Sequence, residues 1–201
     1  ILVIGDEILS GRTQDTNSNF IAKEMEIIGI DTNQIRVIPD EKNIIIESVN
    51  ELRVKNDYLF TTGGIGPTHD DITADSIAEA FKVDLEVNLE AYETLKKYYE
   101  KIGSEFNDIR QRMARIPKGA TLIENSISAA PGFKIENVFV FAGIPKIMKA
   151  MLINSLKHLS KGKLIHSISV KIDAVEGDIA KVLESLNDEN ENIKIGSYPF
   201  F

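Results

Sequence analysis

The residues best suited to chemistry gather in one glycine-rich stretch, residues 61–73, which reads TTGGIGPTHDDIT. Its three glycines let the backbone pass close to a ligand, because no Cβ atom stands in the way. The stretch then places Asp70 and Asp71 just ahead of a predicted helix, and helix N-termini favour anions. Two carboxylates repel an unaccompanied phosphate at this anion-favouring position. We therefore expect either a bound cation or a ligand with its own N–H donors beside them.

The glycine-rich stretch matches neither of two common phosphate-binding motifs. No Lys-Ser or Lys-Thr pair follows its last glycine, as a Walker loop requires. The dinucleotide fingerprint is incomplete because His69 stands at the third glycine position. A purely structural turn, capped by Asp71 or Thr73, is the alternative. His69 is a candidate proton shuttle, although no partner for it is evident in the sequence.

Two further loops carry polar residues suited to the same ligand. The first covers residues 5–18 and the second covers residues 142–145. Within the first, Arg12 can hold a phosphate with two hydrogen bonds, and Asn17 can cap a helix or donate to a ligand. The alternatives are that Arg12 is an ordinary surface arginine and that Asn17 only caps a helix. Because ligands bind beyond the carboxyl ends of parallel strands, all three loops can converge on one crevice.

Alternating strands and helices are predicted over the first 160 residues. Apolar runs predict strands at residues 1–4, 34–38, 58–62, 121–123, 132–135 and 138–141. Apolar residues at helical spacing predict helices at residues 15–28, 44–52, 74–81, 89–102, 106–115 and 145–159. This alternation is typical of βαβ units. We therefore expect an α/β protein with a three-layer α/β/α fold and a mostly parallel sheet.

The remaining residues predict a small α+β extension. After a linker at residues 160–163, we expect a strand, a helix and a strand, at residues 165–172, 178–186 and 193–195. The expected domains are thus residues 1–160 and residues 163–201. The extension is too small to stand alone, and the chain starts at Ile1 within a predicted strand. We expect the extension to be truncated and further residues to precede Ile1.

The composition bounds the class of protein. The net charge of −8 argues against nucleic-acid binding, which needs a surface rich in Lys and Arg. The chain has no cysteine, which excludes disulfides and thiolate catalysis and fits a reducing, cytoplasmic location. No run of about 18 apolar residues occurs, so we expect no membrane partner. The expected partner is a small molecule.

Ordered motifs along the chain resemble those of the molybdopterin-binding, or MoCF-type, domain family. They are GDEILSG at residues 5–11, DTNS at 15–18, TGGIGPTHDDIT at 62–73, IPKGA at 116–120, APGF at 130–133 and GIP at 143–145. The form of the glycine loop is similar to that of one branch, the N-terminal domain of competence/damage-inducible protein A and of FAD synthases. The resemblance covers about residues 1–160, and residues 196–199 are similar to the small domain that follows in that branch.

The resemblance implies a pocket for a phosphorylated pterin or a nucleotide. In this branch it implies a nucleotide pyrophosphatase that acts on ADP-ribose- or FAD-like substrates and depends on a divalent metal (Mg, Mn or Co) and potassium. Asp70 and Asp71 are then the predicted catalytic residues, and Glu7 joins them as a predicted metal ligand. A non-catalytic module that holds molybdopterin or a nucleotide is the alternative. It is favoured by Ala142 and Ile147, which replace a proline and a glutamate of the family pattern.

The resemblance also implies a homo-oligomer, with residues 89–115 as a candidate contact surface. The predicted ligand-binding residues are Gly5, Asp6, Glu7, Ser10, Gly11, Arg12, Asn17, Thr62, Gly63, Gly64, Gly66, Pro67, Thr68, Thr73, Gly143 and Pro145.

Overall fold

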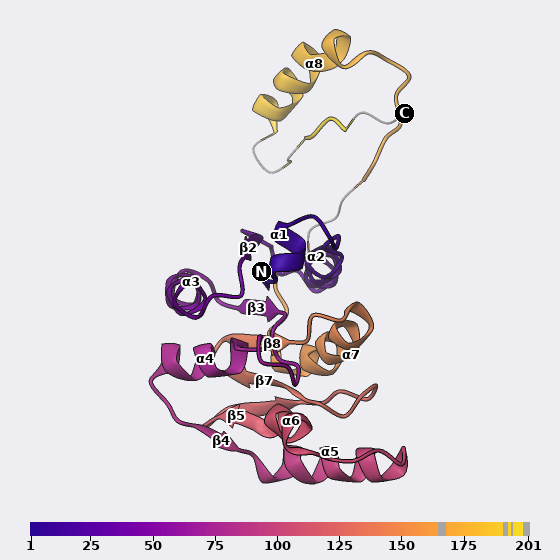
Figure 1. Cartoon of the computed structure of the whole chain (residues 1–201). Coiled ribbons are helices and arrows are strands. Elements are labelled where there is room, and N and C mark those ends of the chain that lie inside the picture. The colour runs from indigo at the N-terminus through magenta and orange to yellow at the C-terminus, as the bar shows by residue number, and fades with distance from the viewer. Residues whose placement is uncertain (165–167, 191–192, 194, 199–201) are drawn as a thin grey trace. The chain divides into compact units, whose positions relative to one another are not determined.

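A six-stranded sheet forms the centre of the first of two units, residues 1–165 and residues 166–201 (Figure 1). The computed structural model describes residues 1–164, 168–190, 193 and 195–198. The strands are β1 (Leu2–Ile4), β2 (Arg36–Ile38), β3 (Leu59–Thr62), β6 (Thr121–Ile123), β7 (Gly132–Ile135) and β8 (Val138–Phe141). Their order is β2-β1-β3-β8-β7-β6, parallel from β2 to β8 and antiparallel beyond. The carboxyl ends of β2, β1, β3 and β8 therefore share one edge.

Helices cover both faces of this sheet (Figure 1). They are α1 (Asp6–Leu9), α2 (Asn17–Ile27), α3 (Lys42–Lys55), α4 (Thr73–Phe81), α5 (Leu89–Lys101), α6 (Asp108–Gln111) and α7 (Pro145–Ser155). Buried side chains of α2 and α7 pack against Phe60, Phe139 and Phe141 in one core cluster. Side chains of α3 and α4 pack with Leu59 and Val140 in the other. The alternation of these strand residues between the two faces confirms the predicted three-layer α/β/α fold.

The helical segment predicted at residues 106–115 is shorter in the structure and only partly α-helical. Only α6 is α-helical there; a 3₁₀ turn, η1 (Arg112–Ala114), and a strand, β5 (Arg115–Pro117), follow it. Strand β5 pairs antiparallel with β4 (Leu85–Val87), which the sequence pattern did not predict. Proline disfavours helical conformation at the residue before it, so Pro117 stops the helix early. Three-residue strands are too short to give a clear alternation.

The second unit, residues 166–201, is described by its helix. Helix α8 (Glu176–Glu189) confirms the helix predicted at residues 178–186, and none of its described side chains is buried. Residues 168–172 are not in a strand, and residues 165–167 of that prediction lie outside the described residues. Of the predicted strand at 193–195, residue 194 lies outside the described residues and the other two are irregular. No helix in the described ranges is both long and apolar enough to cross a membrane.

Candidate functional site

The three predicted loops meet at the carboxyl edge of the sheet, and one buried side chain joins them. Asn17, the first residue of α2, is 6% exposed. Its Nδ2 donates to Thr62 Oγ1 at 2.9 Å and to the carbonyl oxygen of Gly143 at 2.7 Å. Thr62 Oγ1 in turn donates to the carbonyl oxygen of Ala142 at 2.9 Å. The loops after β1, β3 and β8 are thus fixed relative to one another, as the crevice hypothesis requires.

The helix cap at this edge comes from Asp15 rather than from Asn17. Asp15 Oδ1 accepts the backbone N–H groups of Asn17 and Ser18 at 2.9 and 3.1 Å, and its Oδ2 accepts from Ser18 Oγ. Asp15 therefore satisfies the free N–H groups that begin α2. This leaves the amide of Asn17 free to tie the loops together.

Asn17 Oδ1 is left without a donor. It is buried, and no hydrogen-bond partner for it exists among the described residues. The orientation of the amide is set by Gly143, because a carbonyl oxygen only accepts and so must face Nδ2. An unpaired buried acceptor costs about 1–3 kcal/mol, which a ligand N–H group would offset. The orphaned oxygen therefore favours a donor-bearing ligand at this position.

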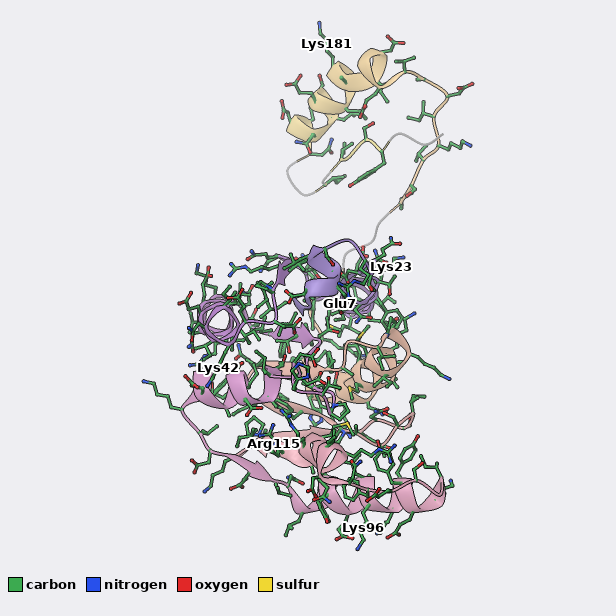
Figure 2. The ribbon with its side chains drawn as sticks, in the orientation of Figure 1. Glu7, Lys23, Lys42, Lys96, Arg115 and Lys181 are labelled. Carbon is green, nitrogen blue, oxygen red and sulfur yellow. The ribbon has the colours of Figure 1, made fainter. Side chains whose placement is uncertain are left out.

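A small pocket opens beside Asn17. It has a volume of about 50 Å³, which is room for a few waters or the edge of a heterocycle. Its polar lining comes from Glu7, Thr13, Gln14, Asp15, Thr16, Asn17 and Thr62. Figure 2 shows Glu7 on α1, the short helix that follows β1. The polar part of this lining includes two carboxylates, Glu7 and Asp15, which repel a phosphate and accept N–H donors.

The glycines of the loop after β3 are required by the protein's own packing. Gly63 has a φ of 114°, and a Cβ atom on it would lie 2.0 Å from the carbonyl oxygen of Ile4. Gly64 has a φ of 66°, and its Cβ would lie 2.3 Å from Thr73 Oγ1. The sequence pattern predicts that these glycines make room for a closely approaching ligand. In the structure they let the loop lie against β1 and α4, so ligand contact at either glycine stays a prediction.

Asp71 holds the glycine loop closed. Its Oδ1 accepts the N–H of Gly66 at 2.7 Å, and its Oδ2 accepts the N–H and Oγ1 of Thr68 at 2.8 and 2.6 Å. Three hydrogen bonds to one carboxylate restrict its movement. A catalytic role for Asp71 stays a prediction. Its neighbour Asp70 is exposed, with His69 Nδ1 3.9 Å from its Oδ1.

The other predicted ligand-binding residues lie in several environments. Gly5 is buried at the end of β1 and Thr73 is fully buried, its hydroxyl without a partner in the described structure. Gly11, Arg12 and Ser10 are exposed, and Ser10 Oγ donates to the carbonyl oxygen of Glu7 at 3.3 Å. The remaining predicted residues at the surface or partly buried are Asp6, Pro67, Thr68 and Pro145, which begins α7. Thr73 and Thr62 are 0% and 1% exposed, and ligand contact at both residues stays a prediction.

Asp40 is a site residue that the sequence argument missed. It follows β2 at the same carboxyl edge, and its Oδ2 accepts the backbone N–H of Asp6 at 2.9 Å. Burial raises the pKa of Asp40, and the negative charges of Asp6, Glu7 and Asp70 raise it further. The sequence offered a signal for Asp40, because Pro39-Asp40 directly follows the strand predicted at residues 34–38, as the other loops follow their strands.

The predicted metal ligands do not assemble into a cluster. Within the described part of the chain, no group of three or more His, Cys, Asp or Glu residues could hold a metal ion. Asp71 has its carboxylate oxygens turned to the loop, and Asp70 is exposed. Glu7, Asp70 and Asp71 therefore do not fit a resident divalent ion as they stand. Metal binding at these residues stays a prediction.

Family models match both units of the chain. Residues 1–161 match the probable molybdopterin binding domain, and residues 164–201 match the FAD synthase middle domain. The chain belongs to the probable molybdopterin binding domain family. The family match confirms the resemblance that the ordered motifs indicated.

Archaeal members of the family are similar over nearly the whole chain. A protein from Archaeoglobus fulgidus is 36% identical over 199 residues, which cover 99% of this chain and 84% of that protein. Protein TK1472 from Thermococcus kodakarensis is 37% identical over 213 residues, covering 99% of this chain and 84% of that protein. Their names assign no activity.

Two solved structures place the fold within this family. CinA from Thermoplasma acidophilum, described as of unknown function, has a TM-score of 0.72 and 31% identity, covering 78% of this chain and 94% of that chain. MoaB from Pyrococcus furiosus, described as a tungsten cofactor synthesizing protein, has a TM-score of 0.51 and 23% identity, covering 78% and 88%. The second likeness concerns the fold alone. The CinA match agrees with the branch that the glycine loop predicted.

Proposed function

We propose that the crevice at the carboxyl edge of β1, β3 and β8 binds a phosphorylated nucleotide or pterin. The observation that carries the proposal is the unpaired Oδ1 of buried Asn17, beside a pocket lined by carboxylate and amide oxygens. Adenine and pterin rings both present amino and ring N–H groups that such oxygens accept. The match to the probable molybdopterin binding domain supports a cofactor-related ligand, without choosing between pterin and nucleotide.

The proposal gives each loop a part in binding. Asn17 and Glu7 accept from the heterocycle, and the loop after β8 closes one side of the pocket through Gly143 and Pro145. The glycine loop, held by the hydrogen bonds from Gly66 and Thr68 to Asp71, lies beside the heterocycle's phosphorylated end. Because these groups are fixed by hydrogen bonds before the ligand arrives, little ordering cost accompanies binding.

The direct test is calorimetric titration with AMP, ADP-ribose, FAD and a phosphorylated pterin. We expect saturable binding of at least one of them by the unaltered protein. Glu7→Gln should weaken it about tenfold, because the amide offers one acceptor oxygen where the carboxylate offers two. The matched control is Glu26→Gln, an exposed position on α2 with the same change in charge. Equal affinity in both variants and the parent would contradict the assignment of Glu7.

A second candidate is hydrolysis of a nucleotide pyrophosphate bond. It is favoured by the mutual repulsion of four carboxylates, those of Asp6, Glu7, Asp40 and Asp70. This repulsion adds to the effect of burial in raising the pKa of Asp40. A cation that arrives with the substrate would relieve the repulsion. A divalent ion, when bound, would neutralise the phosphates. Because the residues do not form a resident ligand cluster, we derive no hydrolytic step through it. Incubation of ADP-ribose or FAD with Mg, Mn or Co and potassium tests the candidate, and release of AMP would support it.

A further inference from the structure

A second recess borders the glycine loop on the side of the small β4–β5 sheet. Its lining includes Ile65, Gly66 and Asp71 from the loop, Asp75 from α4, and Arg112 and Arg115. Its volume is about 20 Å³, enough for one water-sized group such as a phosphate oxygen. The Asn17 pocket and this recess share no lining residue, but both border the glycine-rich stretch: Thr62 lines the pocket, and Ile65, Gly66 and Asp71 line the recess.

The two carboxylates of this recess already have partners. Asp71 accepts from Gly66 and Thr68, as described above. Asp75 accepts from both η-nitrogens of Arg115, at 3.2 and 3.0 Å. Figure 2 shows Arg115 on β5, so this ion pair joins β5 to α4. The charge of Asp75 is thus paired with Arg115, whereas Asp71 is held by neutral donors.

The two arginines, by contrast, keep unused donors. Arg115 Nε is buried and has no hydrogen-bond partner among the described residues. Arg112 is half-buried, and its guanidinium has no ion pair, hydrogen bond or ring contact with any residue that the structure describes. A buried cationic donor without a partner is costly and calls for an acceptor. Planar guanidinium groups suit phosphate oxygens, which they bind with two hydrogen bonds.

We propose that Arg112 and Arg115 form a phosphate-binding site at the mouth of this recess, which holds the diphosphate of a nucleotide whose base lies at the Asn17 pocket, with one phosphate oxygen entering the recess. The inference rests on the proposed function and deepens it, because it orients the ligand and selects a diphosphate-bearing one. It also moves the phosphate contact from Arg12, which is exposed on the loop after β1, to the opposite flank of the glycine loop. Arg115 stays fixed by Asp75, and Arg112 is the adjustable contact.

The test compares the calorimetric affinities of ADP, adenosine and inorganic pyrophosphate for the full chain and four variants. Arg112→Gln should weaken ADP and pyrophosphate at least tenfold and leave adenosine unchanged. Lys118→Gln removes the same charge from an exposed turn on the same segment and should change none of the three. Arg12→Gln should also change none. Arg112→Lys, which keeps the charge but loses the planar fork, should give an intermediate loss.

Each outcome decides a separate point. If Arg112→Gln leaves ADP and pyrophosphate affinity unchanged, or if Arg12→Gln causes the loss instead, the inference is overturned while nucleotide binding stands. If the unaltered protein binds pyrophosphate through Arg112 but binds no nucleotide or pterin, the proposed function fails and the anion site stands. If pyrophosphate does not bind at all, the inference is overturned. An unfolding midpoint for Arg112→Gln close to that of the parent shows that the fold is intact.

Discussion

Asn17 is the residue on which the site depends most, because its single amide connects three loops. Its two donated hydrogen bonds reach Thr62 on β3 and Gly143 after β8. The sequence argument proposed a helix cap or a ligand donor for Asn17. The structure shows the side chain donating to the protein itself and offering its oxygen instead. That outcome depends on where β3 and β8 end, which no local pattern around Asn17 contains.

Replacing Asn17 therefore tests its role in stability. Asn17→Ala should lower the free energy of unfolding by about 1–3 kcal/mol, because the Gly143 carbonyl and Thr62 lose their buried partner. Asn154→Ala is the matched control, since Asn154 also donates to a backbone carbonyl, that of Glu124, but at an exposed position. Urea unfolding of both variants measures the difference. A loss for Asn17→Ala no larger than that for Asn154→Ala would contradict the bridging role.

The raised pKa of Asp40 leads to a prediction about how the protein's stability depends on pH. Its pKa is raised in the folded protein, so the folded state holds the proton more tightly than the unfolded chain. The stability that this contributes is present below the unfolded pKa and is lost as pH rises through the folded pKa. Asp40→Asn, which cannot ionise, should therefore be more stable than the parent at neutral pH, with the difference vanishing at acid pH. Thermal unfolding across that range measures it; a constant difference would count against it.

At the scale of the elements, the glycine loop shows what sequence can and cannot anticipate. Its position between β3 and α4 and its meeting with the other two loops were predictable, because parallel strands bring their carboxyl ends to one edge. The partners of its side chains were not. Asp71 folds back on Gly66 and Thr68 only because the loop curls, and that path depends on contacts with Ile4 and Thr73 distant in the chain.

Packing of the loop against β1 predicts a strong effect at Gly63. Gly63→Ala should destabilise the fold by more than about 2 kcal/mol, because the new Cβ atom meets the Ile4 carbonyl oxygen and the backbone cannot move away. Gly11→Ala serves as the control: Gly11 also has a positive φ, of 70°, but nothing lies within 4 Å of its Cβ position. Guanidinium unfolding compares the two. Equal losses would mean that the clash is relieved at no cost.

For the whole molecule, alternation of strands and helices was enough to predict the three layers, and the order of the family motifs was enough to predict the family. The β4–β5 sheet was missed because three-residue strands carry too little pattern. Within residues 168–172, alternating apolar residues predicted a strand that the structure does not have. Strand formation depends on pairing with another segment, and a local pattern does not contain that information.

The division into two units predicts that residues 1–164 keep both fold and site. All core clusters and the candidate site lie within them. A chain ending at residue 164 should unfold at nearly the same temperature as the full chain and show the same ligand stabilisation. A chain ending at residue 158 should unfold earlier, because it loses the Ser160–Tyr58 and Gly162–Ile28 hydrogen bonds. Loss of ligand stabilisation in the 1–164 chain would show that the second unit contributes to the site.

The most direct test of the central claim is calorimetric titration of two proteins, the full chain and its Asn17→Ala variant. The ligands are AMP, ADP-ribose, FAD and a phosphorylated pterin. The account predicts one saturable site in the parent for at least one of these ligands, and at least tenfold weaker binding in a folded Asn17→Ala protein. No binding of any of the four by the parent, or equal binding by both proteins, would contradict it.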